Sequence, residues 1–423
     1  MLALFVSPRA QAQACTPLSA ELASALTLAA ALERTQECHP DVRAATGALA
    51  AAGADVTTAA QGVNPQLTVG AASISRNLGS GPWWNKTLDH QIRVDQTIER
   101  GGKLALRRAA AETLREAARA DFNEALRRAR LGVAQSYHEL AAALARRTET
   151  AAALELAGDA QRAQSLRVKA GDAAPIDATR VALDAIRVQA DLRQAEADVH
   201  AARVQLATLL GAPEWAEKLL PVDDGLRLRE LNFSASDLEL NSTGRRPDVL
   251  AASNRLRAAE QALELARAQR VRDVGLGVQF DRYPVSATNS SGSGNTLSVS
   301  VSVPLFIRHG FDGEIARAEA DVANARETQR RAQLTARSDL AQAQSRWSAA
   351  AARMRLATTE LAPAAERVAA GAELAYRRGA TSLLDVLDAR RGRRAAHIER
   401  INAEADGAKA AAELEAARFE LPY

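Results

Sequence analysis

Two carboxylates near the end of the chain are the residues best placed to do chemistry. Asp385 and Asp388 lie three residues apart in a segment with helical periodicity, so both side chains fall on one face of the predicted helix. An unperturbed aspartate has a pKa of about 3.9, so such a pair is negative at neutral pH and attracts cations. A second interpretation stays open, in which Asp385 only caps the helix near Ser382.

Few other residues are spaced for chemistry. The 6 histidines are scattered, without an HxH, HExxH or Cys/His cluster. The sequence has no GxSxG segment, and Gly102-Lys103 is followed by leucine rather than serine or threonine, so neither a hydrolase nucleophile nor a phosphate loop is predicted. We therefore expect no enzyme activity, no catalytic residue, no bound metal and no cofactor.

The composition favours long helices over one large globular core. The chain has 423 residues, of which 97 are alanine and only 4% are aromatic. Alanine is the strongest helix former but fills little volume, so alanine-rich helices suit close packing. The net charge is +3 with both signs interspersed, which gives no drive toward nucleic acid. No run of 18 consecutive apolar residues occurs, so no transmembrane helix is predicted.

The chain repeats itself at a nearly fixed offset. Residues 39–45 read HPDVRAA and residues 246–252 read RPDVLAA, 207 positions apart. Residues 171–177 line up with residues 379–385 at an offset of 208. An offset kept across separated segments indicates a tandem duplication. The predicted limits are a signal peptide over 1–14, a first repeat over 15–210, a connecting segment over 211–245 and a second repeat over 246–423.

Each repeat contains two segments with the alternation of a β-strand. Ile92 and Val94 alternate with Arg93 and Asp95, and residues 297–305 alternate apolar residues with serine. One apolar face and a length of 9–11 residues are what a bilayer-spanning strand needs. Four strands cannot close a barrel and lipid does not tolerate an open edge, so we expect three protomers to share twelve strands. In the first repeat the predicted strands are about 67–76 and 88–98, which together span 67–98. In the second repeat they are about 274–283 and 295–305, which together span 274–305.

Long helices accompany these strands in both repeats. Residues 103–166 contain no proline and would extend about 90 Å as one helix. Alanine and leucine at helical spacing, separated by charged residues, are typical of coiled-coil layers. A soluble coiled-coil interaction protein is an alternative of another class, but it leaves the strand pairs unexplained. The predicted helices are about 27–62, 103–166, 176–210, 246–271, 312–377 and 382–418.

The N-terminal segment has the pattern of an export signal. Residues 2–6 are apolar and Ala12-Gln13-Ala14 precedes Cys15, as at a signal-peptidase site, but the basic N-terminal region is missing and the signal looks truncated. In an exported protein the two cysteines, Cys15 and Cys38, predict a disulfide. Lipidation of Cys15 and free thiols are the alternatives left open.

Several motifs together resemble those of the outer-membrane efflux channel (TolC-like) family. The duplicated layout is the most specific of them and covers about residues 25–418. Residues 98–103, Ile-Glu-Arg-Gly-Gly-Lys, look most like the cobalt-zinc-cadmium resistance branch of that family. The other motifs are Asn-Pro-Gln-Leu at 64–67, the strand ends at 96–103 and 304–306, Tyr376 to Gly379, and Asp385 to Ala389.

The resemblance implies a fold that is mainly α with a membrane β-barrel. Each protomer would give four strands to a shared twelve-stranded trimeric barrel in the outer membrane, continuous with a coiled-coil tunnel in the periplasm. The implied function is passive efflux of heavy-metal cations from the periplasm to the outside. The implied partners are two further copies of the chain, outer-membrane lipid, a periplasmic adaptor and an inner-membrane pump of the resistance-nodulation-division type. A duct for drugs or for type I secretion is the alternative.

The resemblance also assigns roles to residues at the tunnel end. Tyr376, Asp385 and Asp388 match the periplasmic gate of the family, where rings of three carboxylates in a trimer would select cations. The hairpin tips would contact the adaptor, although the cations there also suit helix ends. These tip residues are Lys169, Gly171, Arg377, Arg378 and Gly379.

The two repeats are predicted to differ at this end. The family often has a basic residue where Thr381 stands, which argues against the usual salt-bridged latch. In the first repeat, Asp177 and Arg180 occupy the places of the two aspartates and predict an ion pair within one helix.

Overall fold

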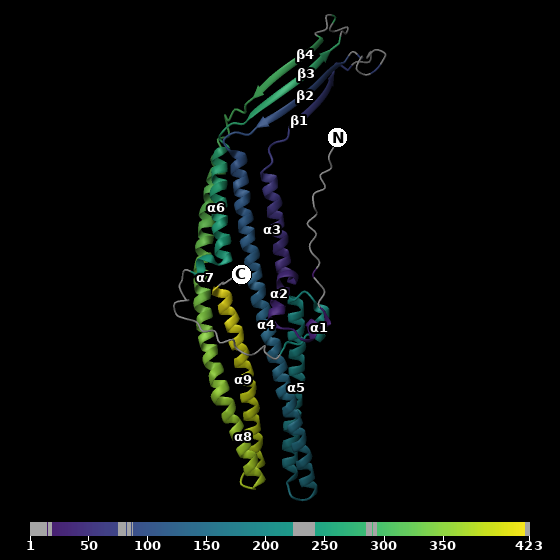
Figure 1. The fold of residues 1–423 in the computed structure, drawn as a ribbon, viewed down its shortest axis with the longest axis vertical. Helices are drawn as coiled ribbons and strands as arrows, with labels where there is room; N and C mark the ends of the chain where they lie inside the picture. The colour runs from purple at the N-terminus through teal and green to yellow at the C-terminus, as the bar shows by residue number, and fades with distance from the viewer. Residues whose placement is uncertain are drawn as a thin grey trace. The chain divides into compact units, whose positions relative to one another are not determined.

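The computed structural model describes residues 15, 19–74, 82, 86, 88–222, 242–284, 290 and 294–418. The predicted signal peptide, 1–14, lies outside these residues. Helices and strands follow one another in the same order in both halves (Figure 1). None of the helices in the described segments has both the length and the apolar character needed to cross a membrane.

The first half contains α1 (Ala20–Ser24), α2 (Leu28–Cys38), α3 (Pro40–Ala59), β1 (Gln66–Ala72), β2 (Asp89–Ile98), α4 (Lys103–Lys169), α5 (Pro175–Leu209) and the short helix η2 (Pro213–Lys218). The second half contains the short helix η5 (Ser242–Arg245), α6 (Pro247–Ala268), β3 (Val274–Tyr283), β4 (Gly294–Ser302), α7 (Asp312–Leu356), the π-turn η6 (Ala357–Leu361), α8 (Ala362–Arg377) and α9 (Leu383–Arg418).

The four strands form one antiparallel sheet in the order β1-β2-β3-β4. β2 and β3 join the two halves of the chain, with Ile92 opposite Phe280 and Val94 opposite Val278. These four apolar side chains lie on one face and are 41% to 50% exposed. The same exposed face continues through Leu67, Val69, Leu276, Leu297, Val299 and Val301. An apolar surface of this kind marks contact with something other than water.

Two strands are shorter than the alternation predicted. β1 ends at Ala72 instead of 76, because the next residue, Ser73, has a positive φ of 61° that a strand does not accommodate. β4 ends at Ser302 instead of 305, just before Pro304, which has no N–H to donate to a neighbouring strand.

The long helices of the two halves differ in continuity. α4 runs unbroken for 67 residues. The sequence predicted one helix over 312–377 in the second half, but the structure has α7, the π-turn and α8 there. Pro363 lies at the second position of α8. A proline in a helix removes one N–H donor and collides with the preceding turn, and the wider π-turn makes room for it.

The predicted helix over 27–62 is also two helices. α2 ends at Cys38 and α3 begins at Pro40. His39 between them has an extended backbone, with ψ of 130°, which is the conformation that a following proline favours. Thr27 starts α2 by accepting a hydrogen bond from the Ala30 N–H.

Buried residues gather in several small clusters. The largest lies where α1, α2, α4 and α5 meet, around Tyr137, whose hydroxyl donates to the Leu26 carbonyl at 3.0 Å. A smaller cluster joins Ala142 of α4 to Ile401 and Ala405 of α9. Alanine dominates these contacts, so the helices lie close together as the composition predicted.

Two compact units divide the chain. One comprises residues 1–48, 120–250 and 331–423, and the other comprises 49–119 and 251–330. Each unit takes segments from both halves, so the packing does not follow the repeats. The limits 15–210, 211–245 and 246–423 therefore remain a prediction about the sequence.

Candidate functional site

Two helical hairpins end in glycine turns. α4 leads into α5 through Gly171 and α8 leads into α9 through Gly379, with φ of 84° and 74°. Glycine adopts such angles without the steric cost that a Cβ brings, which explains its place at both turns. Lys169, Arg377 and Arg378 are exposed beside these turns, at helix ends where the dipole favours cations. The structure thus places all five predicted tip residues at the two tips.

Asp385 closes a hydrogen-bonded cap at the start of α9. Its Oδ2 accepts hydrogen bonds from Thr381 Oγ1 at 2.6 Å, from Ser382 Oγ at 2.7 Å and from the Ser382 N–H at 3.0 Å. The Asp385 N–H donates to Ser382 Oγ at 3.3 Å, which completes a capping box. The hydrogen bonds from Thr381 and then Ser382 hold the pKa of Asp385 below its ordinary value. The cap therefore keeps this carboxylate ionised.

Asp388 is more open than Asp385. Its side chain is 64% exposed and accepts a hydrogen bond from Arg391 Nη1 at 3.2 Å. Both aspartates line one groove between α8 and α9. The shared helix face that the three-residue spacing predicted is therefore present in each protomer.

Tyr376 links the two tips. Its hydroxyl accepts a hydrogen bond from Arg167 Nη1 at 2.6 Å, and the Arg167 guanidinium lies 5.6 Å from the ring centre. Sequence reasoning singled out Tyr376 but missed Arg167, although Arg167 lies only four residues before Gly171. Its position in the last turn of α4, two residues before Lys169, is the signal that could have found it.

Ion pairs between α5 and α9 were also missed. Arg391 Nε lies 2.8 Å from Asp184, whose side chain is only 12% exposed, and Arg394 lies 3.1 Å from Asp191. Asp184 lies 13 residues after Gly171, and Arg391 lies 12 residues after Gly379. The two hairpins are therefore in direct contact at nearly equivalent positions.

The first hairpin has Arg180 at the position where the second has Asp388. Asp177 and Arg180 form the ion pair predicted for them within α5, at 3.3 Å. At this level the first hairpin has one carboxylate, which pairs with Arg180, and the second has two, of which Asp388 shares Arg391 with Asp184.

The polar face of the sheet holds its own network. Arg93 binds Asp95 on the same strand through two contacts of 2.7 Å. Its guanidinium also donates to Gln279 at 3.3 Å and to Ser300 at 3.4 Å. One face of the sheet is therefore apolar and the other is hydrogen-bonded and charged.

In the described part of the chain, no three His, Cys, Asp or Glu side chains come together as a metal site.

Comparison with known proteins shows which family has this combination of a four-stranded sheet and two long helical hairpins. The family model of the outer membrane efflux proteins matches residues 31–212 and 241–418. The chain belongs to the outer membrane efflux protein family. The cobalt-zinc-cadmium resistance protein CzcC of Cupriavidus metallidurans is 26% identical over 375 residues, which cover 88% of this chain and 84% of CzcC. The pyoverdine export outer membrane protein OpmQ of Pseudomonas aeruginosa is 28% identical over 309 residues, 69% of this chain and 61% of OpmQ.

Solved structures share the fold. CusC has a TM-score of 0.78 at 18% identity, covering 95% of each chain. The outer membrane protein VceC of Vibrio cholerae has a TM-score of 0.76 at 20% identity, covering 92% of this chain and 95% of VceC. At these identities the likeness concerns the fold.

As an outer membrane efflux protein, the chain is an outer-membrane channel of a tripartite efflux system, with a periplasmic tunnel. Proteins of this family are channels rather than enzymes. The soluble coiled-coil alternative is therefore wrong: it accounted for the helices and left the exposed apolar sheet face without a role.

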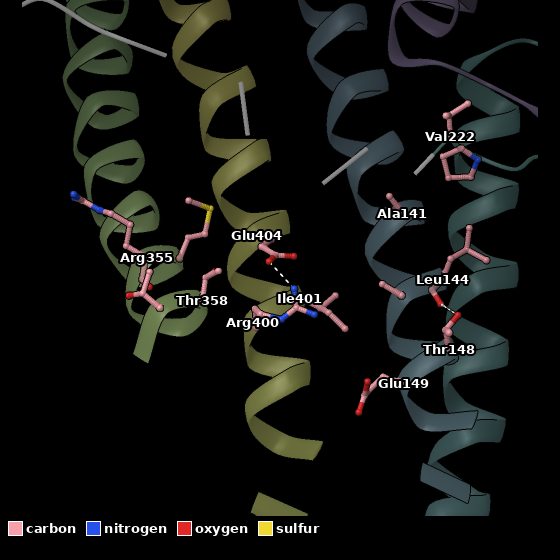
Figure 2. Close-up of a pocket in the computed structure, with 14 residues that line it drawn as sticks. Ala141, Leu144, Thr148, Glu149, Val222, Arg355, Thr358, Arg400, Ile401 and Glu404 are labelled. Carbon is pink, nitrogen blue, oxygen red and sulfur yellow. Dashed lines mark hydrogen bonds and ion pairs between the residues drawn. The ribbon is translucent and has the colours of Figure 1, made fainter. Parts of the chain in front are cut away.

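A cavity of about 720 Å³ lies beside the π-turn of this efflux protein (Figure 2). Its lining includes Leu144 of α4, Thr358 of the π-turn and Ile401 of α9. Arg400 and Glu404 pair at 2.9 Å along its α9 side. The cavity was not predicted, because its lining comes from α4, the π-turn and α9, which are far apart in the sequence.

The predicted pairing of the cysteines can be compared with the structure. Cys15 and Cys38 form a disulfide, which ties the N-terminal segment to the end of α2. Arg34 binds beside this disulfide. Its Nη2 donates to Cys15 Sγ at 3.3 Å, and its Nε donates to the Leu210 carbonyl at 3.0 Å. A lipid thioether on Cys15 would need the sulfur that this disulfide uses.

Proposed function

We propose that three copies of the chain share one twelve-stranded barrel. The sheet has four strands, with β1 and β4 at its edges. A barrel in lipid needs about eight strands or more and leaves no edge unpaired. Three identical sheets joined edge to edge meet both needs and turn the exposed apolar face toward lipid. This face is the observation that carries the proposal.

We further propose that the channel exports heavy-metal cations together with a periplasmic adaptor and an inner-membrane resistance-nodulation-division pump. The relative CzcC, which is matched over 88% of this chain, is named for cobalt, zinc and cadmium resistance. The acidic pair at the tip suits a cationic substrate. The exposed Lys169, Arg377 and Arg378 at the two tips suit contacts with the adaptor.

The gate is proposed at Tyr376, Asp385 and Asp388. In a trimer the two aspartates would form two rings of three carboxylates, which attract cations and repel anions. The cap occupies one oxygen of Asp385, so Asp388, which is 64% exposed, has the larger part in this selection. Cofactors have no part in the mechanism, because the pump supplies the energy.

A second candidate substrate is an organic molecule. The relative OpmQ is named for pyoverdine export and is 28% identical. A passive tunnel recognises its cargo weakly, so the pump and the adaptor would then decide between a metal and an organic substrate.

Growth tests separate these substrates. Deleting the gene from its own bacterium should lower the inhibitory concentration of Zn²⁺, Co²⁺ or Cd²⁺ at least about fourfold, and the intact gene should restore it. A strain that keeps full metal resistance but secretes less siderophore or becomes drug-sensitive would favour the organic substrate. Trimer formation is tested apart from this, by native mass spectrometry in detergent.

A further inference from the structure

Four arginines of α9 line one small cavity inside the protomer. The cavity has a volume of about 40 Å³ and lies where α9 meets α4 and α5. Spacings of four and three residues place Leu387, Arg391 and Arg394 on one face of α9, toward those two helices. Among the described residues, Asp184 is the one carboxylate of the lining. We call this space the arginine cavity, after Arg390, Arg391, Arg393 and Arg394.

Helix packing alone does not account for these arginines. Residues 171–177 align with residues 379–385 at an offset of 208. At that offset, the equivalent positions of α5 hold only uncharged residues, which are Ala182, Leu183, Ala185 and Ile186. The four positive charges are therefore particular to the second repeat, and the helical hairpin common to both repeats does not need them.

Most of the negative charge near these arginines lies outside the cavity. Asp184 is only 12% exposed and lies 2.8 Å from Arg391 Nε. The other carboxylates that pair with the four arginines are 37% to 64% exposed and do not belong to the lining; they are Asp191, Glu366, Glu373 and Asp388. Water screens exposed charges more than charges around a buried space. The interior of the cavity is therefore positive.

Two of the guanidinium groups have buried N–H groups left to donate. A guanidinium carries five N–H hydrogens and has no acceptor. Arg393 Nε and Arg394 Nη1 are buried, and within the described part of the chain neither has an acceptor at hydrogen-bonding distance. A buried charged donor without an acceptor is costly. Both side chains line the cavity, so an anion placed there would accept from both of them.

We propose that the arginine cavity is a binding site for one small inorganic anion, which is chloride under physiological conditions. Arg393 Nε and Arg394 Nη1 donate hydrogen bonds to the anion, and the remaining guanidinium groups supply positive charge around it. The site lies within one protomer. It depends neither on the proposed trimer nor on the exported substrate.

Size and polarity select the kind of anion. One buried water needs about 10–15 Å³, so a space of about 40 Å³ admits a small inorganic anion and excludes an organic anion of metabolite size. Apart from the five charged residues, the lining is apolar. Moving a doubly charged anion from water into such surroundings costs more than moving a singly charged one. Chloride and bromide therefore fit the site better than sulfate.

The anion would strengthen the contact of α9 with α5. Arg391 pairs with Asp184 at 2.8 Å, and Arg394 pairs with Asp191 at 3.1 Å, so α9 and α5 already meet at this level. Four like charges around one space repel each other, and a negative ion between them offsets that repulsion. The stability of this contact should therefore rise with the chloride concentration.

Bromide in crystals of the detergent-purified protein tests the location. Bromide replaces chloride and gives an anomalous X-ray signal. The expected result is one anomalous peak in the arginine cavity, within hydrogen-bonding distance of Arg393 Nε or Arg394 Nη1. Only water at that place, in a map where both side chains are well resolved, would overturn the inference.

Thermal unfolding tests binding in solution. At constant ionic strength, replacing gluconate by chloride should raise the melting temperature of the wild type by about 2 °C. Arg394→Gln removes one buried donor and one charge, and should lose at least about half of this rise. Sulfate, which stabilises proteins by exclusion from their surface, should raise the melting temperature of both proteins equally.

The matched control is Arg400→Gln. Arg400 also lies on α9 and also pairs with a carboxylate, Glu404 at 2.9 Å, but it does not line the arginine cavity. This variant should keep the whole chloride effect. An equal loss in both variants would show a general effect of charge on α9 and would contradict the site.

Two further outcomes are decisive. A bromide peak together with an equal chloride effect in wild type and Arg394→Gln means an adventitious ion only, and overturns the inference. If Arg394→Gln fails to fold, Arg393→Gln removes the other buried donor and should lose the chloride effect in the same way; a full effect in that variant would contradict the site. Each of these results leaves the proposed function standing, because trimer formation and metal resistance are measured separately.

Discussion

At the two hairpin tips, equivalent positions of the repeats carry different charges. Asp177 and Arg180 form one ion pair in the first hairpin, whereas the second has two carboxylates, of which Asp388 shares Arg391 with Asp184. In the sheet, by contrast, the two repeats still match, because every strand has an apolar and a polar face in the same register. Contact with lipid, as proposed, makes one demand on all four strands, whereas the proposed gate needs charge at its narrow part only.

The repeats also differ where α3 and α6 begin. His39 and Arg246 are equivalent and both are buried, at 4% and 2% exposure. Burial is the larger influence on His39 and lowers its pKa, and the negative charge of Asp41 offsets this only in part. Arg246 instead binds Asp248 at 2.7 Å and Asp339 at 2.9 Å. The second repeat thus buries a paired charge where the first buries a histidine.

The largest effects should come from the sheet, where the repeats are equivalent. Ile92→Arg in the first repeat and Val301→Arg in the second should each cost roughly 2–4 kcal/mol and impair insertion, because both side chains lie on the apolar face. Heat-modifiable mobility of outer-membrane fractions measures the folded share. Ser298→Arg, on the other face of β4, should be tolerated. Clearly unequal effects of the two arginine variants would break the equivalence.

A smaller effect is expected where α6 begins. Asp248→Asn should destabilise the protein by about 2 kcal/mol at pH 7, because it removes a charged partner of the buried Arg246. Asp41→Asn, its equivalent in the first repeat, should cost clearly less. Thermal unfolding of both variants measures the difference.

The same pair predicts a pH dependence. Burial opposes ionisation of Asp248, but the hydrogen bond and charge of Arg246 outweigh it and lower the pKa of Asp248. Its stabilisation is therefore complete above about pH 4 and is lost as the pH falls through the lowered pKa. The difference in stability between the wild type and Asp248→Asn should therefore disappear in acid. A difference that stayed constant to pH 2 would contradict this.

The tip aspartates should affect conduction more than stability. Asp388→Asn should reduce cation selectivity, and with it any block by multivalent cations from the periplasmic side, at an unchanged melting temperature. Asp385→Asn should reduce selectivity less and lower the melting temperature slightly, because it weakens the cap. The reversal potential in a salt gradient across a planar bilayer separates the two. An unchanged potential in the double variant would mean that neither aspartate lines the pore.

The smallest effect belongs to the first hairpin. Asp177→Asn removes a partly exposed pair within α5, worth about 0.2–0.5 kcal/mol, and should leave the reversal potential unchanged. It is the matched control for Asp388→Asn. Equal shifts in both variants would show that the two tips share the selection.

Much of the fold was predictable because its signals are local. Alternation placed all four strands, and the absence of proline from 103–166 predicted the single long helix α4. The breaks at His39 and at the π-turn had visible causes in Pro40 and Pro363, but helical periodicity on both sides outweighed them.

The candidate site was only partly predictable, since it depends on which helices meet. Asp385 and Asp388 follow from spacing along one helix. Arg167 contacts Tyr376 only because the two hairpins lie together, and Arg391 reaches Asp184 for the same reason. Spacing along one segment does not determine such contacts between separate helices. The rings, which need three chains, remain a prediction.

The pairing of β2 with β3 also has a consequence for the order of folding. Ile98 lies opposite Val274, so this ladder closes a chain loop of about 175 residues. Closing such a loop costs roughly 4–5 kcal/mol of entropy before any strand contact repays it. Each β-hairpin, β1 with β2 or β3 with β4, closes a far shorter loop and forms first. The complete apolar sheet face therefore assembles late in folding, which shortens the time that a newly exported chain spends in water with an aggregation-prone surface.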